Sequence, residues 1–301
     1  HAVDFYCEVE EMRQQTKGIG YMLCSALCFS MMNACVRLAG DVPSMQKMFF
    51  RNLISMLVAL FLIWREKVPI HVPRPQWQHL FFRSFWGTVG VVCNFYAVDH
   101  MLLSDATMLN KMSPFFALLF SAWLLHEGAT AVQMLLSFVA LGGCVFILKP
   151  TLSGLISPVA LIALLGGMTA GLAYTEVRIL GVAKVNKDVI ILIFSLFSCL
   201  TALPFLIFDY RAMTLGQLGF LLLTGMFATG GQFCITSAYC CAPASEVAVY
   251  DYSQILFAAV LGYFLFQQAP DALSVTGYVV ICTAAVAMTL YNRRRSASCR
   301  T

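Results

Sequence analysis

Residues 97–111 read AVDHMLLSDATMLNK, and residues 238–252, which lie 141 positions later, read AYCCAPASEVAVYDY. The same register extends on both sides of these stretches without a gap. Chance similarity between apolar segments explains matched alanines and valines more easily than a matched serine–acid pair, so we interpret the register as an internal duplication. The matches are Thr88 with Thr229, Gly90 with Gly231, Ala97 with Ala238, Ser104-Asp105 with Ser245-Glu246, Ala117 with Ala258 and Val139 with Val280.

The composition predicts an integral membrane protein. Of the 301 residues, 60% are apolar and 11% are charged, and the mean hydropathy is +0.79. A soluble domain carries about 25% charged residues, which it needs to cover its surface. Soluble enzymes, nucleic-acid-binding domains and disordered linkers are therefore excluded.

The apolar runs predict an all-α membrane protein with ten transmembrane helices. Each run has the ~20 residues that cross a bilayer and is about twice as long as a barrel strand. The runs lie at about 18–38, 44–64, 77–98, 104–125, 130–148, 157–179, 188–208, 215–238, 246–266 and 272–291.

The duplication divides these helices into two repeats. We expect a polar N-terminal tail at 1–17, a first repeat of five helices at 18–150, a second at 154–291 and a basic tail at 292–301. Because five is an odd number, the second repeat enters from the opposite side of the membrane. Inverted repeats of this kind are typical of secondary transporters, in which one half rocks against the other.

The lysines and arginines of the loops predict the orientation. With the N-terminus inside, twelve of them lie on the cytoplasmic side and four on the other. This bias favours cytoplasmic termini.

Several motifs also carry a resemblance to a known family. They are Phe49-Phe50-Arg51-Asn52, residues 97–114 with their Ser-Asp-Ala-Thr and Ser-Pro elements, His126-Glu127, and residues 242–253 from Ala242-Pro243-Ala244-Ser245 to Tyr252-Ser253. In these motifs the chain resembles EamA-type members of the drug/metabolite transporter superfamily over residues 18–291, with Gln267-Gln268 where the pattern usually has an acid. The resemblance implies that spans one to four and six to nine surround a central cavity. It also implies that spans five and ten are peripheral and available for homodimer formation.

Polar residues within the spans are candidate site residues, since a charge at the bilayer centre costs roughly 2.5–3.5 kcal/mol. Lys111 and Asn110 are matched in the repeat by Tyr252 and Asp251, and these four form the best candidate for a substrate site. The alternative is an ion pair of Lys111 with Asp251 or Asp105 that merely joins the halves. Arg51 is equally consistent with a site and with a structural pair, whereas an ion pair or snorkelling is favoured for Arg83. Further candidates are Asn33, Asn94, Tyr174, Gln232 and Tyr250, with Asp251 and Glu246 for proton coupling.

These observations predict a secondary transporter, an exporter of a small organic metabolite such as an amino acid or organic acid. The expected partners are this solute and the lipid of a bacterial inner membrane, with no nucleic acid. No cofactor is expected, and the twelve cysteines lack metal-site spacing. A P-loop, HExxH and GxSxG are missing from the sequence. The alternatives are a membrane-embedded enzyme or a channel with a polar intramembrane site.

Overall fold

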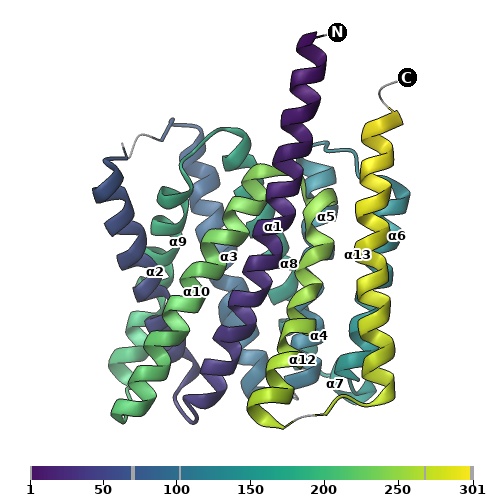
Figure 1. Ribbon diagram of the computed structural model, residues 1–301. Helices are drawn as coiled ribbons and strands as arrows, with labels where there is room; N and C mark the ends of the chain where they lie inside the picture. The colour runs from purple at the N-terminus through teal and green to yellow at the C-terminus, as the bar shows by residue number, and fades with distance from the viewer. Residues whose placement is uncertain (1, 69–71, 102, 268, 299–301) are drawn as a thin grey trace.

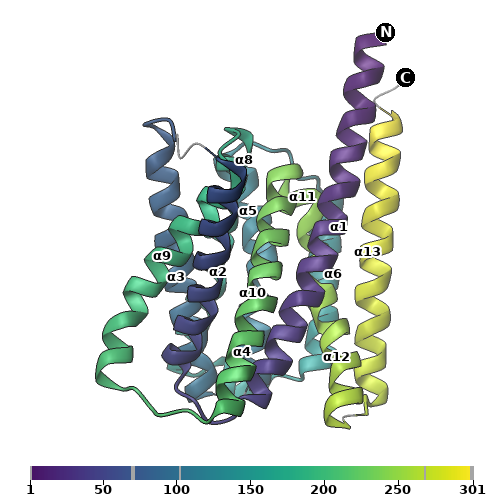
Figure 2. The same ribbon diagram turned by 60° about the vertical axis from the view of Figure 1, so that its left-hand side comes forward.

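The computed structural model describes residues 2–68, 72–101, 103–267 and 269–298, all in helices or the short segments that join them (Figure 1). The helices run up and down in one bundle, and the two chain termini lie at the same end of it (Figures 1 and 2). We call this end the termini end and the other the far end. In chain order the elements are α1 (Ala2–Leu38), α2 (Ser44–Glu66), α3 (Gln76–His100), α4 (Leu103–Asn110), α5 (Ser113–Leu124), α6 (Ala131–Leu148), α7 (Leu152–Leu155), α8 (Pro158–Val182), α9 (Lys187–Phe208), α10 (Leu215–Cys241), α11 (Ala244–Val247), the 3₁₀ helix η1 (Ala248–Tyr252), α12 (Ser253–Phe266) and α13 (Ala272–Ser298).

The predicted spans and the observed helices begin and end within a few residues of each other. The tails differ, because α1 begins at Ala2 and α13 continues to Ser298, so both polar segments extend a helix. Among the described residues, eight helices are long and apolar enough to cross a membrane. We call each crossing of the bundle from one end to the other a pass. The pass formed by α3 and the pass formed by α4 and α5 together do not meet that criterion.

Two passes are interrupted at matching places. In the first half, α4 ends at Asn110 and α5 begins at Ser113, with Pro114 in its first turn. Proline lacks a backbone N–H and is favoured in the first turn of a helix, so it fixes the start of α5. In the second half, η1 separates α11 from α12 without a proline. The prolines of the sequence predict interruptions at Pro114 and Pro204; the first is confirmed, whereas the second is wrong because α9 continues past Pro204, and no proline marks η1.

The packing of the helices repeats between the two halves. α1 packs along α10, and α3 packs along α8; α2 packs on α9, and α6 on α13. The starts of α4 and α11, at residues 103 and 244, are 141 apart, as are those of α6 and α13, at 131 and 272. Since this is the register of the sequence matches, each element of the first half has a counterpart in the second.

Glycines allow the closest of these helix approaches. A Cβ on Gly90 of α3 would lie 3.1 Å from the carbonyl oxygen of Gly166 in α8, and one on Gly277 of α13 would lie 2.5 Å from that of Gly143 in α6. A Cβ on the neighbouring Gly142 would meet nothing within 4 Å. Gly143, and not Gly142, therefore forms the contact with α13.

Gly167 of α8 gives a testable case. A Cβ at this position would lie 2.6 Å from the carbonyl oxygen of Leu109, next to the break between α4 and α5. We expect Gly167→Ala to lower the free energy of unfolding by about 1–3 kcal/mol, because overpacking forces backbone to move. The measurement is the melting temperature in detergent, with Gly142→Ala as the matched control, whose melting temperature should not fall. Equal melting temperatures for the two variants would contradict this close packing.

The outer surface of the bundle is apolar. Large exposed side chains occur on most of the helices, and they include Trp64, Phe82, Leu135, Phe138, Leu200, Phe208, Val279 and Leu290. Soluble monomers rarely expose such continuous apolar surface. A lipid environment accounts for it.

Candidate functional site

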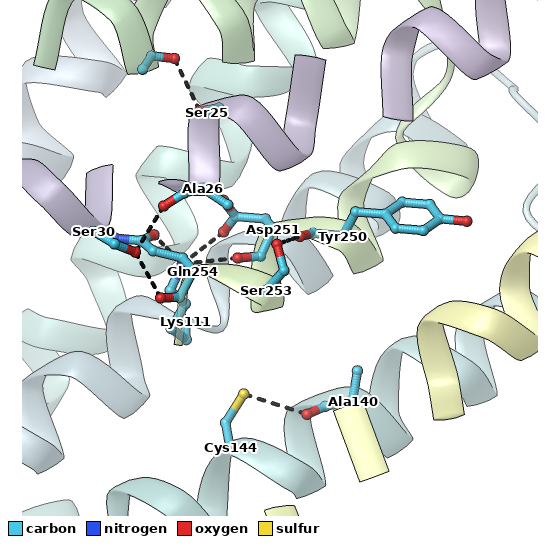
Figure 3. A network of polar contacts seen from close by, with 11 residues as sticks. Ser25, Ala26, Ser30, Lys111, Ala140, Cys144, Tyr250, Asp251, Ser253 and Gln254 are labelled. Carbon is cyan, nitrogen blue, oxygen red and sulfur yellow. Dashed lines mark hydrogen bonds and ion pairs between the residues drawn. The ribbon is translucent and has the colours of Figure 1, made fainter. Parts of the chain in front are cut away.

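A buried ion pair joins the two interrupted passes. The Lys111 Nζ lies 2.9 Å from the Asp251 Oδ2, and both residues are 6% exposed. Lys111 lies between α4 and α5, and Asp251 lies in η1, so each occupies the break of its own half (Figure 3). The sequence alternative of a Lys111–Asp251 pair is thus present, while the side chain of Asp105 lies outside the described residues. Two opposite charges from the two halves therefore meet inside the bundle.

The lysine has further oxygen partners. Its Nζ donates to the Gln254 Oε1 at 2.5 Å and to the backbone carbonyl of Asp251 at 3.4 Å. The 3₁₀ turn explains the second contact, since a break in an α-helix leaves carbonyl oxygens without their usual donors. Three oxygens around one ammonium compensate for its removal from water.

Helix α1 also contacts this cluster, through Ser30. The Ser30 Oγ donates to the carbonyl oxygens of Ala26 in its own helix and Gln254 in α12, each at 2.8 Å (Figure 3). Ser30 is 2% exposed. A helix of the first half is thus fixed to the residue that contacts Lys111.

The neighbours Tyr252 and Tyr250 have different surroundings. Tyr252 is fully buried, and its hydroxyl has no hydrogen-bond partner among the described residues. The hydroxyl of Tyr250 lies 2.6 Å from the Thr289 Oγ1 of α13, and its side chain extends away from Asp251 (Figure 3). The sequence grouped Tyr250 with the site, but its hydroxyl contacts Thr289 of α13 and not the Lys111 cluster, so its role at the site stays a prediction.

The other predicted site residues are distributed along the bundle. Asn110 and Asn94 are half-buried, and Asn33 is exposed on α1. Gln232 is buried in α10, where its amide lies 3.5 Å from the Thr236 hydroxyl. The structure does not bring these four amides into the contacts of Lys111.

Glu246, the second residue suggested for proton coupling, lies in α11 and is half-buried. It is outside the contacts of Lys111 described above.

Two arginines and a tyrosine form a second polar group. Tyr174 of α8 lies within the electrostatic range of Arg51, Arg83 and Asp251, and its ring stacks on Tyr239 of α10 at 5.1 Å between centroids. Arg83 is only 2% exposed. The sequence favoured snorkelling or an ion pair for Arg83, but it does not reach the surface and it pairs with no acid among the described residues.

A third group ties the helices together at the termini end. The Arg178 Nε of α8 donates to the Glu127 Oε1 at 2.7 Å, and its Nη1 donates to the carbonyls of Tyr239 and Cys240 at the end of α10. The Ser121 hydroxyl donates to the other Glu127 oxygen at 2.8 Å. This group therefore joins α5 of the first half to α8 and α10 of the second.

Comparison with known proteins now identifies the family. Residues 16–149 and 157–290 each match the sequence model of the EamA-like transporter family. The chain belongs to the EamA-like transporter family. The expected resemblance is confirmed, and the two matches cover both halves of this membrane transport protein.

Curated relatives match this EamA-family chain over nearly their whole length. A pseudopaline exporter, CntI, of Pseudomonas aeruginosa strain UCBPP-PA14 is 33% identical over 273 residues, which are 90% of this chain and 95% of the relative. An uncharacterized transporter of Helicobacter pylori strain J99 is 27% identical, covering 91% of this chain and 94% of the relative. An S-adenosylmethionine uptake transporter of Rickettsia bellii is 24% identical, covering 96% and 98%. These three relatives are thus named as transporters, two of them of small metabolites.

A solved crystal structure has the same fold. It superposes with a TM-score of 0.77 at 17% identity and covers 93% of this chain and 98% of that chain. The arrangement of helices is therefore that of a known fold.

Sequence reasoning missed several residues of these groups. Gln254 and Ser30 were not singled out, Arg178 was counted only as a loop charge, and Glu127 only as part of a motif. Gln254 lies one helical turn after Asp251 and just after Tyr252, the repeat mate of Lys111. That proximity to the matched position was the available signal.

Proposed function

We propose that the protein is a secondary transporter that exports a small organic metabolite, such as an amino acid or organic acid, by alternating access. The observation that carries the proposal is the buried Lys111–Asp251 pair, which lies between the breaks of the two halves. Ionisable groups at broken helices near the middle of two repeats are typical of transporter sites. Lys111, Asp251, Tyr252, Arg51 and Tyr174 would line the path of the solute, with Asn110, Asn94, Gln232 and Asn33 along it.

The same proposal includes ten spans in two inverted repeats. α3 and α4–α5 fail the hydropathy criterion, but they carry Arg83 and Lys111, the polar groups expected where a helix faces a cavity. An even number of passes agrees with two termini at one end of the bundle (Figure 2). The lysine and arginine bias of the loops supports cytoplasmic termini, and the bacterial relatives support an inner membrane.

The relatives bear on the nature of the solute. The curated relatives include an exporter of pseudopaline and an uptake transporter of S-adenosylmethionine. We propose outward movement by analogy with the former. Two driving forces are compatible with this proposal. Export is either coupled to protons through Asp251 or Glu246, or uncoupled and driven by the gradient of the solute itself. The exposed apolar faces of α6 and α13 are the proposed contact for a homodimer.

Reconstitution tests the proposal. Media of bacterial cells that express the wild type or a Lys111→Met/Asp251→Leu variant are compared by mass spectrometry, and the solute enriched by the wild type is loaded unlabelled into proteoliposomes. A labelled tracer of that solute should then accumulate transiently inside, because a carrier exchanges it against the preloaded pool.

The alternatives give different results. A channel equilibrates the tracer without transient accumulation, and an enzyme converts the solute in detergent. Either outcome would overturn the proposal. So would media of the two bacterial strains that contain the same solutes in the same amounts.

A further inference from the structure

Two arginines of the first half share an unusual environment, in which Arg83 is buried and Arg51 is half-buried. The Arg83 guanidinium lies 4.2 Å from the centroid of the Phe194 ring, and that of Arg51 lies 5.9 Å from the Phe29 ring. Neither guanidinium has an ion pair or a hydrogen bond among the described residues, and the buried Nε of Arg83 is unpartnered there. Aromatic rings contact these cations without neutralising their charge.

The two cations also act on each other. Arg51 and Arg83 are close enough to repel, and Tyr174 lies within the field of both. The acid that acts electrostatically on Tyr174 is Asp251, and its carboxylate already accepts a hydrogen bond from Lys111. Buried charges are normally paired, because removal from water is costly. Two guanidinium groups that repel each other and have no carboxylate partner among the described residues therefore point to a bound solute as the source of the counter-charge.

Gly87 makes room for one of these guanidinium groups. It lies one turn after Arg83 in α3, and a Cβ there would overlap the Arg83 Nη1 and lie 2.9 Å from the Phe194 ring. The Arg83 guanidinium thus lies against its own helix, at the position that a Cβ of residue 87 would occupy. The guanidinium edge, with donors that match a carboxylate in geometry, stays unpaired.

We infer that Arg51 and Arg83 form the recognition site for a dicarboxylate solute, with the Tyr174 hydroxyl as an additional donor. This assignment rests on the proposed transport function and specifies its substrate class. Each guanidinium would take one carboxylate in a two-pronged contact, while the flanking phenylalanine rings hold its face. Neutral amides of the same shape would leave both charges uncompensated.

The test measures thermal shifts of the detergent-purified full chain. The probes are sodium succinate and L-glutamate, the diamide succinamide, L-glutamine, which keeps one carboxylate, and inorganic phosphate, at constant ionic strength. Succinate or L-glutamate should raise the melting temperature of the wild type, succinamide should not, and L-glutamine should raise it less than L-glutamate does. Arg51→Gln, Arg83→Gln and Gly87→Ala should each raise the half-saturating concentration at least tenfold, whereas Gly142→Ala should keep it within twofold.

A second measurement needs no ligand. Without carboxylate, Arg83→Gln should raise the melting temperature, because it removes an uncompensated buried charge, whereas Arg178→Gln removes a paired one and should lower it. A lower melting temperature for Arg83→Gln would overturn the inference. So would the absence of any carboxylate shift, an equal shift with the amides, or stabilisation by phosphate at a lower concentration.

The outcomes separate this inference from the transport function. If the protein transports a neutral or cationic solute and the carboxylate shift is missing, the dicarboxylate site is refuted and the transporter remains. If succinate or L-glutamate binds through both arginines and proteoliposomes show no counterflow, the site remains and the transport proposal fails.

Discussion

Lys111→Met is expected to stop transport and to destabilise the protein. The substitution leaves Asp251 as a buried carboxylate without its ammonium, although the two groups lie 2.9 Å apart in the wild type. Breaking a buried pair by removing one partner costs roughly 3–5 kcal/mol. We expect the melting temperature in detergent to fall accordingly and counterflow to be lost, because the ammonium that lies between the breaks of the two halves is gone.

The double variant Lys111→Met/Asp251→Leu separates stability from transport. Replacing a buried pair by apolar residues of similar volume is often neutral or stabilising, so the free energy of unfolding should return to within about 1 kcal/mol of the wild-type value and the melting temperature should recover with it. Transport should stay absent, because the ionisable groups are gone. A double variant that transports at the native rate would show that the pair only joins the two halves.

Arg178→Gln is expected to open the termini end of the bundle. The variant loses the charged contact to Glu127 at 2.7 Å and weakens the contacts to the last carbonyls of α10. A hydrogen bond between charged groups contributes about 1.5 kcal/mol or more, so the equilibrium between the closed and open arrangements should shift roughly tenfold toward the open one. Cys240 is half-buried beside this contact and serves as the reporter.

The measurement is the rate at which N-ethylmaleimide alkylates Cys240, followed by peptide-resolved mass spectrometry of the full chain. The rate should rise about tenfold in Arg178→Gln, while the exposed Cys282 of α13 reacts unchanged as an internal reference. Lys149→Gln is the control, because it removes an exposed ion pair with Asp271 at the far end. An unchanged Cys240 rate would mean that Arg178 and Glu127 do not hold this end closed.

The helix positions were predictable because they depend on local properties. Apolar runs of about 20 residues mark a segment that crosses lipid whatever it packs against. The breaks were harder to predict. Pro114 marks the first, but η1 contains no such residue and is a 3₁₀ turn only in its packed environment.

The candidate site was predictable in part. The repeat register brought Lys111 and Asp251 to adjacent matched positions, and the structure pairs them. The register could not give side-chain directions. Neighbouring residues of a 3₁₀ helix point about 120° apart, so Tyr250 reaches Thr289 of α13 although Asp251 faces Lys111.

The sequence by itself determined the membrane environment, the helical class and the duplication, since composition, apolar run length and residue register need no knowledge of contacts. Only the tertiary structure decided which charges are compensated. Lys111 finds its acid 140 positions away, whereas Arg83 lies against a phenylalanine ring with no acid in reach among the described residues. The physical reason is that electrostatic compensation acts over a few ångströms of space, and helix packing sets those distances independently of separation along the chain.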